Sequence, residues 1–268
     1  MRIAAWNGES GGFDGYDQKA TRPQHLDAIL HLVAQIAPDI IGIIDAYRWD
    51  EVMDWSLWGK LGYVRWFHTR LEDDRVEPAI GIAALSKRDD VEFRSVWLGN
   101  RQAIKAVVPT TAGPARVYFV YFYDLSEDSR MESARALWED AGQDPLLPVA
   151  ALGDFNCAPA GELPAMLRLA GRLARSGAGQ WATRRVPGDL AYGTRAVGEL
   201  TRGEVVPALR RRFTEVNLRG PTAFPVLGGV RLQLQADRIF VRNWRFAGGT
   251  VWPGGGRDHL AISAEFED

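Results

Sequence analysis

The first part of the chain alternates between two hydrophobic patterns. The residues from Arg2 to Trp6 form a short apolar run, which predicts a buried strand close to the first residue. Between Thr21 and Ala37 the apolar residues recur at the spacing of one face of an amphipathic helix. The β-branched run from Ile40 to Ile44 has no polar alternation, which is typical of a strand covered on both faces. We therefore predict the order strand, helix, strand.

The remaining apolar segments are mostly short and predict further strands of a large β-structure. One longer segment, from Ser129 to Ala141, has apolar residues on one side and charged residues opposite, so we predict a helix that packs on a sheet. The chain contains no internal repeat and no linker, and we expect residues 1–268 to form one domain. Gly, Pro and charged turns separate the predicted strands, which are Ile80 to Leu85, Ala103 to Val108, Val117 to Phe122, Leu147 to Leu152, Ile239 to Val241 and Leu260 to Phe266.

Composition narrows the class of protein but not its function. Hydrophobic residues make up 46% of the 268 residues and charged residues 25%, so neither a disordered chain nor a coiled coil is expected. The single cysteine, Cys157, cannot form an internal disulfide and leaves no zinc cluster to build. Because no long apolar run and no secretory signal occurs, we expect a cytoplasmic protein without membrane binding. Nothing in the sequence implies a partner protein.

Charge is distributed unevenly along the chain. The net charge of −2 gives no general attraction for nucleic acid or anionic lipid. The segment 162–212, however, contains ten arginines and four acidic residues. One interpretation is a face that binds a polyanion, with Arg210, Arg211 and Arg212 as substrate-binding residues. The alternative is that these arginines are ordinary surface and helix residues.

Polar residues gather where several of the predicted strands begin or end. Because the ends of neighbouring strands meet at one edge of a sheet, we expect their side chains to converge. Carboxylate and amide oxygens dominate the set, and such ligands suit Mg²⁺ or Mn²⁺ better than zinc. The segments are Trp6 to Glu9, Ile43 to Asp45, Gly153 to Asn156 and Arg257 to His259, together with Asp237.

The most specific of these segments is the Gly-Asp-Phe-Asn sequence of residues 153–156. Two other stretches accompany it: Ala79 to Ser86 reads Ala-Ile-Gly-Ile-Ala-Ala-Leu-Ser, and Pro221 to Pro225 leads to Gln235 to Val241. In this order and at these intervals, the segments resemble the signature of the endonuclease/exonuclease/phosphatase superfamily. The resemblance extends over residues 2–266. It implies an α/β fold, a four-layer sandwich of two mixed β-sheets packed face to face with helices outside, like that of pancreatic-type deoxyribonuclease.

The resemblance implies catalytic roles for three of the polar residues. Asn7 matches an asparagine that contacts the metal or the scissile phosphate. Asp154 matches an aspartate that orients or deprotonates the attacking water, and Asn156 matches the amide beside it. Asn7 is therefore a candidate both for catalysis and for metal binding.

The same resemblance assigns roles to four further residues. His259 matches a histidine that hydrogen-bonds the phosphoryl oxygen, and Asp237 matches the carboxylate that orients its ring. Asp258 matches a metal-associated acid, and Glu9 stands where some members place a second carboxylate. The chemistry is consistent, because a phosphodiester accumulates negative charge on its oxygens during hydrolysis, and cations and amide donors stabilise that charge.

Two positions depart from the family pattern. Asp45 stands where the family has a metal-binding glutamate, and its side chain is one methylene shorter. Asp124 stands where many members have a histidine. Three alternatives are open at the second position: Tyr123 substitutes for the histidine, Asp124 binds a second cation, or Asp124 binds a cationic substrate.

These residues lead us to expect a Mg²⁺- or Mn²⁺-dependent phosphoesterase that attacks phosphorus with an activated water. A nuclease is the leading interpretation. The near-neutral charge favours instead a phosphatase or phosphodiesterase for a small soluble phosphate. The changes at Asp45 and Asp124 favour a third alternative, a binding protein that has kept the fold and lost turnover. The expected partner is accordingly a substrate, either nucleic acid or a phosphorylated small molecule.

Overall fold

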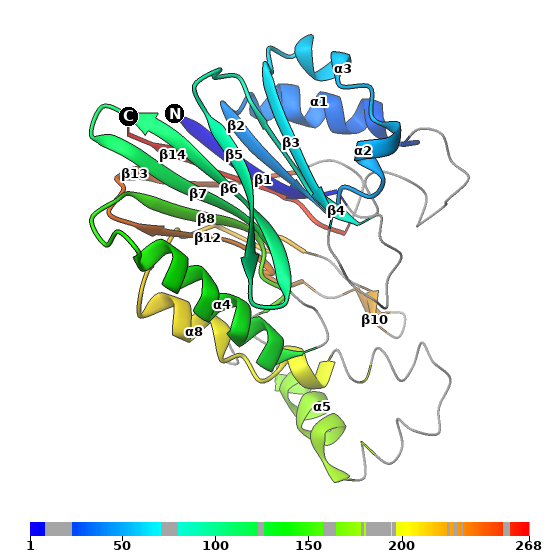
Figure 1. Cartoon of the computed structure of the whole chain (residues 1–268). Helices are drawn as coiled ribbons and strands as arrows, with labels where there is room; N and C mark the ends of the chain where they lie inside the picture. Colours follow the sequence, from blue (N-terminus) through cyan, green and yellow to red (C-terminus); the bar gives the residue numbers. More distant parts are fainter. Residues whose placement is uncertain are drawn as a thin grey trace.

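Two β-sheets lie face to face at the centre of the molecule, and helices lie against their outer surfaces (Figure 1). Each sheet has six strands. Both sheets are mixed, since each contains parallel and antiparallel strand pairs. The computed structural model describes residues 1–8, 23–70, 80–122, 126–157, 165–177, 180, 194, 197–223, 226–227, 230–231, 233–253 and 258–267.

The first sheet is built around the N-terminal strand. β1 (Arg2–Asn7) pairs in parallel with β2 (Ile40–Ile44), because helix α1 (Leu26–Ile36) carries the chain back between them. The strand order is β13-β14-β1-β2-β4-β3. The other four strands are β3 (Arg65–Arg70), β4 (Gly81–Ser86), β13 (Phe246–Trp252) and β14 (Ala261–Phe266).

The second sheet has the order β5-β6-β7-β8-β12-β9. β7 (Gly113–Tyr121) and β8 (Val149–Asp154) are parallel, because helix α4 (Glu127–Gly142) connects them. The remaining pairs of this sheet are antiparallel. The other strands are β5 (Glu92–Leu98), β6 (Arg101–Thr110), β9 (Thr214–Glu215) and β12 (Asp237–Arg242), and a separate pair is formed by β10 (Val226–Leu227) and β11 (Val230–Arg231).

Helices complete the two outer layers. α1, α2 (Trp49–Val52) and α3 (Ser56–Gly59) pack on the first sheet, and α4 and α8 (Val205–Arg210) pack on the second. α5 (Ala165–Arg175) extends away from the sandwich (Figure 1). The predicted four-layer α/β sandwich is therefore confirmed. None of the helices in the described residues is long and apolar enough to cross a membrane.

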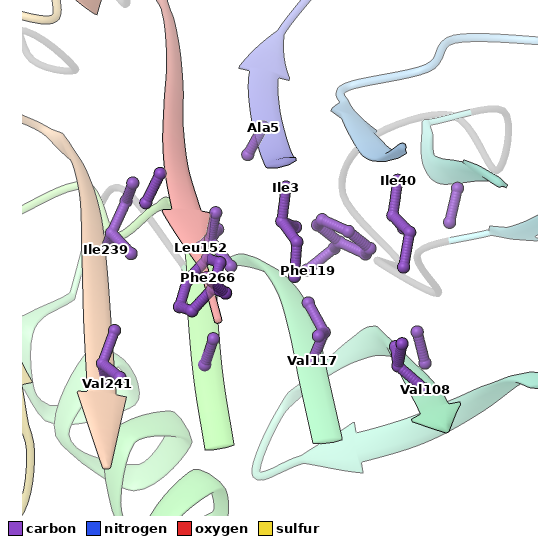
Figure 2. Packing of buried hydrophobic residues seen from close by; sticks show 14 of the residues in the cluster. Ile3, Ala5, Ile40, Val108, Val117, Phe119, Leu152, Ile239, Val241 and Phe266 are labelled. Carbon is purple, nitrogen blue, oxygen red and sulfur yellow. The ribbon is translucent and has the colours of Figure 1, made fainter. Parts of the chain in front are cut away.

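The space between the sheets is filled by side chains from both of them (Figure 2). Ile3 of β1 and Ile40 of β2 face Phe119 of β7 across this space, and all three are fully buried. A Cβ atom at Gly42 would lie 2.2 Å from Cδ1 of Phe119, so only glycine permits this approach of the two sheets. The tight core fixes how the ends of the strands from one sheet meet those of the other.

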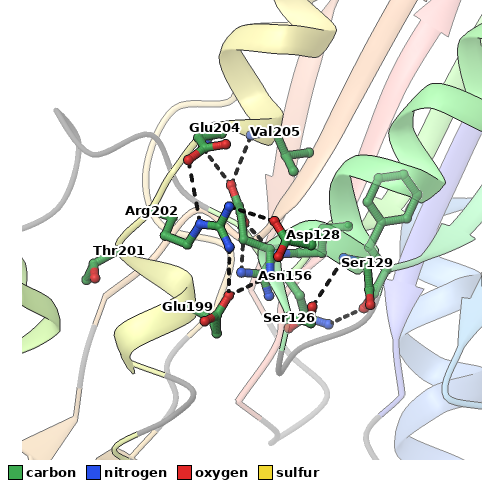
Figure 3. A network of polar contacts seen from close by, with 12 residues as sticks. Ser126, Asp128, Ser129, Asn156, Glu199, Thr201, Arg202, Glu204 and Val205 are labelled. Carbon is green, nitrogen blue, oxygen red and sulfur yellow. Dashed lines mark hydrogen bonds and ion pairs between the residues drawn. The ribbon is translucent and has the colours of Figure 1, made fainter. Parts of the chain in front are cut away.

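A polar network joins the first turns of α4 and α8 (Figure 3). The buried carboxylate of Glu127 accepts hydrogen bonds from the backbone N of Glu204 at 2.5 Å and of Val205 at 3.1 Å. Arg202 forms an ion pair with Asp128 at 2.7 Å. These contacts satisfy amide groups that would otherwise be unpaired at the start of α8. They also place the first turns of both helices side by side.

Candidate functional site

The predicted functional residues gather at one end of the sandwich, where strands of both sheets begin or end. Asn7 ends β1 and lies beside Ile44, the last residue of β2. Asp154 ends β8 and pairs with Asp237 at the start of β12. His259 lies just before β14, which starts beside the end of β1. We call this end of the sandwich the site edge.

An amide and a carboxylate meet at the site edge from opposite sheets. Nδ2 of Asn7 donates to Oδ2 of Asp154 at 2.9 Å, and both side chains are buried. Oδ1 of Asp154 accepts from the backbone N of Asn156 at 2.8 Å. Asn156 has a left-handed backbone, with φ of 47°, and its Nδ2 donates to the carbonyl of Phe122 at 2.9 Å. Asn156 thus holds the turn that orients Asp154, while Asn7 fixes the same carboxylate from the other sheet.

A histidine and a second carboxylate lie next to this pair. Nδ1 of His259 and Oδ2 of Asp237 are 2.8 Å apart, and Nε2 of His259 lies 3.9 Å from Oδ2 of Asp154. Thr222, which sequence reasoning did not assign to the site, accepts at Oγ1 from the backbone N of Asp237 at 2.9 Å. The carbonyl of Thr222 accepts from the backbone N of Leu260 at 2.7 Å. Thr222 therefore positions both members of the His259–Asp237 pair, and its place in the segment 221–225 was the available signal.

These buried groups shift one another's protonation. Burial raises the pKa of Asp154 to about 7, and Asp237 adds to this rise while His259 opposes it. Burial by itself would lower the pKa of His259, but the carboxylates of Asp237 and Asp154 outweigh it and raise that pKa to about 10. At neutral pH the histidine is therefore an imidazolium directed toward Asp154.

Two further carboxylates belong to residues at the site edge. Asp45 follows β2 with a left-handed backbone, φ 54°, and its side chain is buried. Oδ1 of Asp258 is buried, makes no hydrogen bond within the described part of the chain, and lies 3.9 Å from Nε2 of His259. A buried carboxylate oxygen requires a donor or a cation, so this donor set fits a divalent ion. Asp154, Asp237 and His259 also bring ligand atoms within 4.8 Å of one another, a grouping that could itself hold a metal ion.

The three arginines predicted to bind substrate lie away from this set. Arg210, at the end of α8, pairs with Glu215, whose strand meets the middle of β12 rather than its start. The guanidinium of Arg212 lies 5.7 Å from the ring centroid of Trp138, in the second half of α4. Since α4 and α8 start together and run away from the site edge, the structure does not bring Arg210 and Arg212 to the residues that meet there. The substrate-binding role of Arg210, Arg211 and Arg212 stays a prediction.

Three predicted site residues lie outside the described residues: Glu9, Tyr123 and Asp124. The chain leading to each of them reaches the site edge. The backbone N of Gly8 donates to the carbonyl of Ile44 at 2.8 Å, and that of Phe122 donates to the carbonyl of Asp154 at 2.9 Å. The roles of the three residues stay predictions.

Comparison with known families identifies the group to which this chain belongs. The profile of the Endonuclease/Exonuclease/phosphatase family matches residues 4–262. The chain belongs to the endonuclease/exonuclease/phosphatase family. Members of this family are generally metal-dependent phosphoesterases. The match includes all the residues that meet at the site edge, from Asn7 to His259.

Solved structures share the fold of this family member at low sequence identity. An AP endonuclease from Archaeoglobus fulgidus has a TM-score of 0.62 and 16% identity over 100% of both chains. A protein of unknown function from Enterococcus faecalis V583 has a TM-score of 0.61 and 16% identity over 99% of both chains. D. rerio TDP2 complexed with single-strand DNA product has a TM-score of 0.61 and 13% identity, covering 100% of this chain and 99% of its own. No curated protein matches the sequence significantly.

Proposed function

We propose that this family member is a Mg²⁺- or Mn²⁺-dependent phosphodiesterase that hydrolyses nucleic acid with an activated water. One observation carries the proposal. The Asn7–Asp154 hydrogen bond, 2.9 Å long, stands directly beside the His259–Asp237 pair, whose nitrogen and oxygen are 2.8 Å apart. A carboxylate oxygen and an imidazolium nitrogen are thereby held 3.9 Å apart at the site edge, where both would face a bound phosphate.

Each of these residues has a distinct role in the proposed reaction. Asp154 orients the attacking water and accepts its proton, and Asn7 keeps the carboxylate in place. His259 donates from Nε2 to a phosphoryl oxygen, since Nδ1 is engaged by Asp237. The imidazolium would stabilise the transition state more than the bound substrate, because negative charge on the phosphoryl oxygens is greatest in the transition state. Tyr123 stays the predicted substitute for the family histidine, and Asp124 stays the predicted ligand of a second cation or of a cationic substrate.

The divalent ion would be held by oxygen ligands on the first sheet side of the site. We assign it to Asp45, Asn7 and Asp258, with Glu9 as a further ligand. When bound, the ion would neutralise charge on the phosphate oxygens. The side chain of Asp45 would reach such an ion with one methylene less than the glutamate of the family pattern.

Nucleic acid is the substrate class that the fold comparisons support. The proteins of similar fold include an AP endonuclease, a 3'-5' exonuclease from Neisseria meningitidis and a TDP2 complexed with single-strand DNA. A small soluble phosphate ester is the second candidate. The net charge of −2 favours it. So does the placement of Arg210 and Arg212 away from the site edge, because a nucleic acid needs basic contacts along its backbone.

Hydrolysis assays on three substrates test the proposal. Wild-type protein with Mg²⁺ or Mn²⁺ should cleave a single-stranded oligonucleotide and bis(p-nitrophenyl) phosphate, and cleave p-nitrophenyl phosphate poorly. EDTA should abolish the activity. Asp154→Asn and His259→Ala should each lower turnover by at least about 100-fold. His31→Ala, which removes an exposed histidine of α1, serves as the matched control and should leave the activity intact. Activity of His259→Ala within a few-fold of wild type would contradict the assignment, and cleavage of the monoester alone would favour the second candidate.

A further inference from the structure

A row of paired residues leads away from the catalytic carboxylates across the second sheet. Asp237 and Asp154 are paired on β12 and β8, and Asp154 pairs in turn with Tyr121 at the end of β7. Continuing the register of β6 and β7 to the end of both strands places Gln102 opposite Tyr121. Gln102 pairs with Trp97 on β5. The row therefore begins at the site and ends at the edge strand of the sheet.

All members of this row point to the same face of the sheet. Side chains alternate between faces along a strand, so residues two positions apart share a face. Ser95, two positions before Trp97, hydrogen-bonds to Thr69 of the first sheet, with 3.2 Å between the hydroxyl oxygens. Trp97 therefore lies on the face that carries Asp154. The residues two positions from the other members of the row belong to the core between the sheets, and they are Ile239, Leu152, Phe119 and Ile104.

Exposure and charge change along the row. The side chain of Asp154 is 1% exposed, whereas that of Trp97 is 54% exposed. Between them, Tyr121 and Gln102 are half-buried, and the buried guanidinium of Arg101 lies 5.3 Å from the ring centroid of Tyr121. Neighbouring strands are about 4.8 Å apart, which puts Trp97 about 14 Å from Asp154. A buried acid, a half-buried tyrosine and an exposed indole in one row at the ends of the strands fit an extended ligand that has a phosphate at one position and an aromatic group at another.

We propose that Trp97 is a stacking platform for a nucleobase of a single-stranded nucleic acid whose scissile phosphate lies at Asp154. The inference rests on the phosphodiesterase function proposed above. Stacking on an indole is open to every base, because each base has an aromatic face. A base in a duplex is already stacked on its neighbours and would have to be extruded first, so the platform favours single strands. A mononucleotide at Asp154 does not reach Trp97, and the residue therefore selects for substrate length.

A length series of substrates tests this role. We would measure kcat/KM for metal-dependent hydrolysis of oligothymidylates from the dinucleotide to the octanucleotide, with bis(p-nitrophenyl) phosphate as a substrate that has no bases. The variants are Trp97→Ala, Trp97→Phe and, as matched control, Trp66→Ala. Trp66 is 51% exposed on the neighbouring edge strand β3, but it stacks on Trp55 with 4.1 Å between ring centroids, away from the row.

We expect Trp97→Ala to lower kcat/KM for the octanucleotide by about 5- to 100-fold, the range for loss of one stacked base. The dinucleotide and the p-nitrophenyl ester should be hydrolysed almost as by wild type. Trp97→Phe should recover most of the loss, and Trp66→Ala should behave as wild type on every substrate.

Three results would overturn the inference or separate it from the proposed function. Equal activity of wild type and Trp97→Ala on the octanucleotide would overturn it, and so would an equal loss on the p-nitrophenyl ester, which would mark a structural role. If wild type hydrolyses none of the substrates, the proposed function fails. Fluorescence polarisation with a labelled octanucleotide then decides the inference alone. A weaker Kd for Trp97→Ala than for Trp66→Ala would support the platform, and an equal Kd would overturn it.

Discussion

Replacing the carboxylate of Asp237 tests the proposed chemistry most directly, because Asp237 acts through its charge. Asp237→Asn keeps the size of the side chain and an oxygen that can accept from Nδ1 of His259. The backbone contact with Thr222 is also kept, since it involves the N–H of residue 237. The change is the loss of a negative charge 2.8 Å from the imidazole. We therefore expect the pKa of His259 to fall toward its ordinary value.

The size of the effect follows from the raised pKa. The pKa of His259 is about 10, against an ordinary value of 6.5. That difference corresponds to about 5 kcal/mol, at about 1.4 kcal/mol per pKa unit. Three carboxylates, those of Asp237, Asp154 and Asp258, produce the rise against the opposing effect of burial. Asp237 is the largest contributor among these carboxylates, so Asp237→Asn should lower the pKa of His259. If the pKa returned fully to 6.5, the imidazolium fraction at pH 9 would be about 1 in 300, which is the upper limit of the effect, whereas at pH 6 most of the histidine stays charged.

The assay is the pH dependence of phosphodiester hydrolysis at saturating metal. Wild type should keep its activity up to about pH 9, whereas Asp237→Asn should lose activity there, by at most about 300-fold. At pH 6 the variant should keep or gain activity, because the loss of Asp237 also lowers the pKa of the base Asp154. Asp90→Asn is the charge-matched control, because it removes an exposed carboxylate that pairs with Arg88 at 2.7 Å. An equal loss by Asp237→Asn at pH 6 and at pH 9 would refute the role of the imidazolium.

Three other changes have defined outcomes. By titration calorimetry, Asp45→Ala should weaken Mn²⁺ binding and Asp45→Glu preserve or strengthen it; equal affinity in all three proteins would place the ion elsewhere. Asp140→Asn should lower the free energy of unfolding at pH 7 by about 1–3 kcal/mol, because Asp140 accepts from Lys105 at 2.6 Å. Burial raises the pKa of Asp140, but hydrogen bonds from Lys105 and Tyr118 outweigh burial and lower it. The difference in unfolding free energy between wild type and Asp140→Asn should therefore disappear as the pH falls through the lowered pKa of Asp140. A constant difference down to about pH 2 would contradict this prediction. Burial raises the pKa of the Cys157 thiol to about 12. Iodoacetamide should therefore modify Cys157 only after the protein is unfolded. Modification of the native protein would contradict this prediction.

The central strands and the site residues at their ends could be predicted from sequence. The strands β1, β2 and β8 are buried on both faces. Their sequences are therefore short continuous apolar runs, a pattern typical of strands at the centre of a sheet. Asn7 and Asp154 are polar residues at the ends of such apolar runs, so they could be recognised in the sequence as candidate site residues. The structure brings these two side chains into contact, as convergence of the strand ends predicted.

The edge strands could not be predicted in this way. β3, β5 and β13 are half exposed, and the sequence of β5 mixes charged, aromatic and aliphatic residues without a clean alternation. A strand at the edge of a sheet buries little surface, so its hydrophobic pattern is weak. The first residue of helix α1 could not be predicted from the sequence either. The helix begins at Leu26 rather than at Thr21, which lies outside the described residues.

The position of a charge or an aromatic side chain relative to the site depends on strand register, which the local sequence does not encode. Arg210 and Trp97 are two examples: the first was predicted to bind substrate and lies away from the site edge, and the second was not predicted and lies in a row with Asp154. Arg210 belongs to the most basic part of the chain, yet its partner Glu215 meets β12 in the middle, away from Asp237. Trp97 stands in an unremarkable stretch, yet successive pairings from β5 to β8 put it in line with Asp154. Residues on different strands can contact one extended substrate when they lie in the same row across the sheet. The pairing register of the strands determines which residues share a row. The row from Asp154 to Trp97, rather than the arginine-rich segment, is therefore the first place to test the proposed substrate preference.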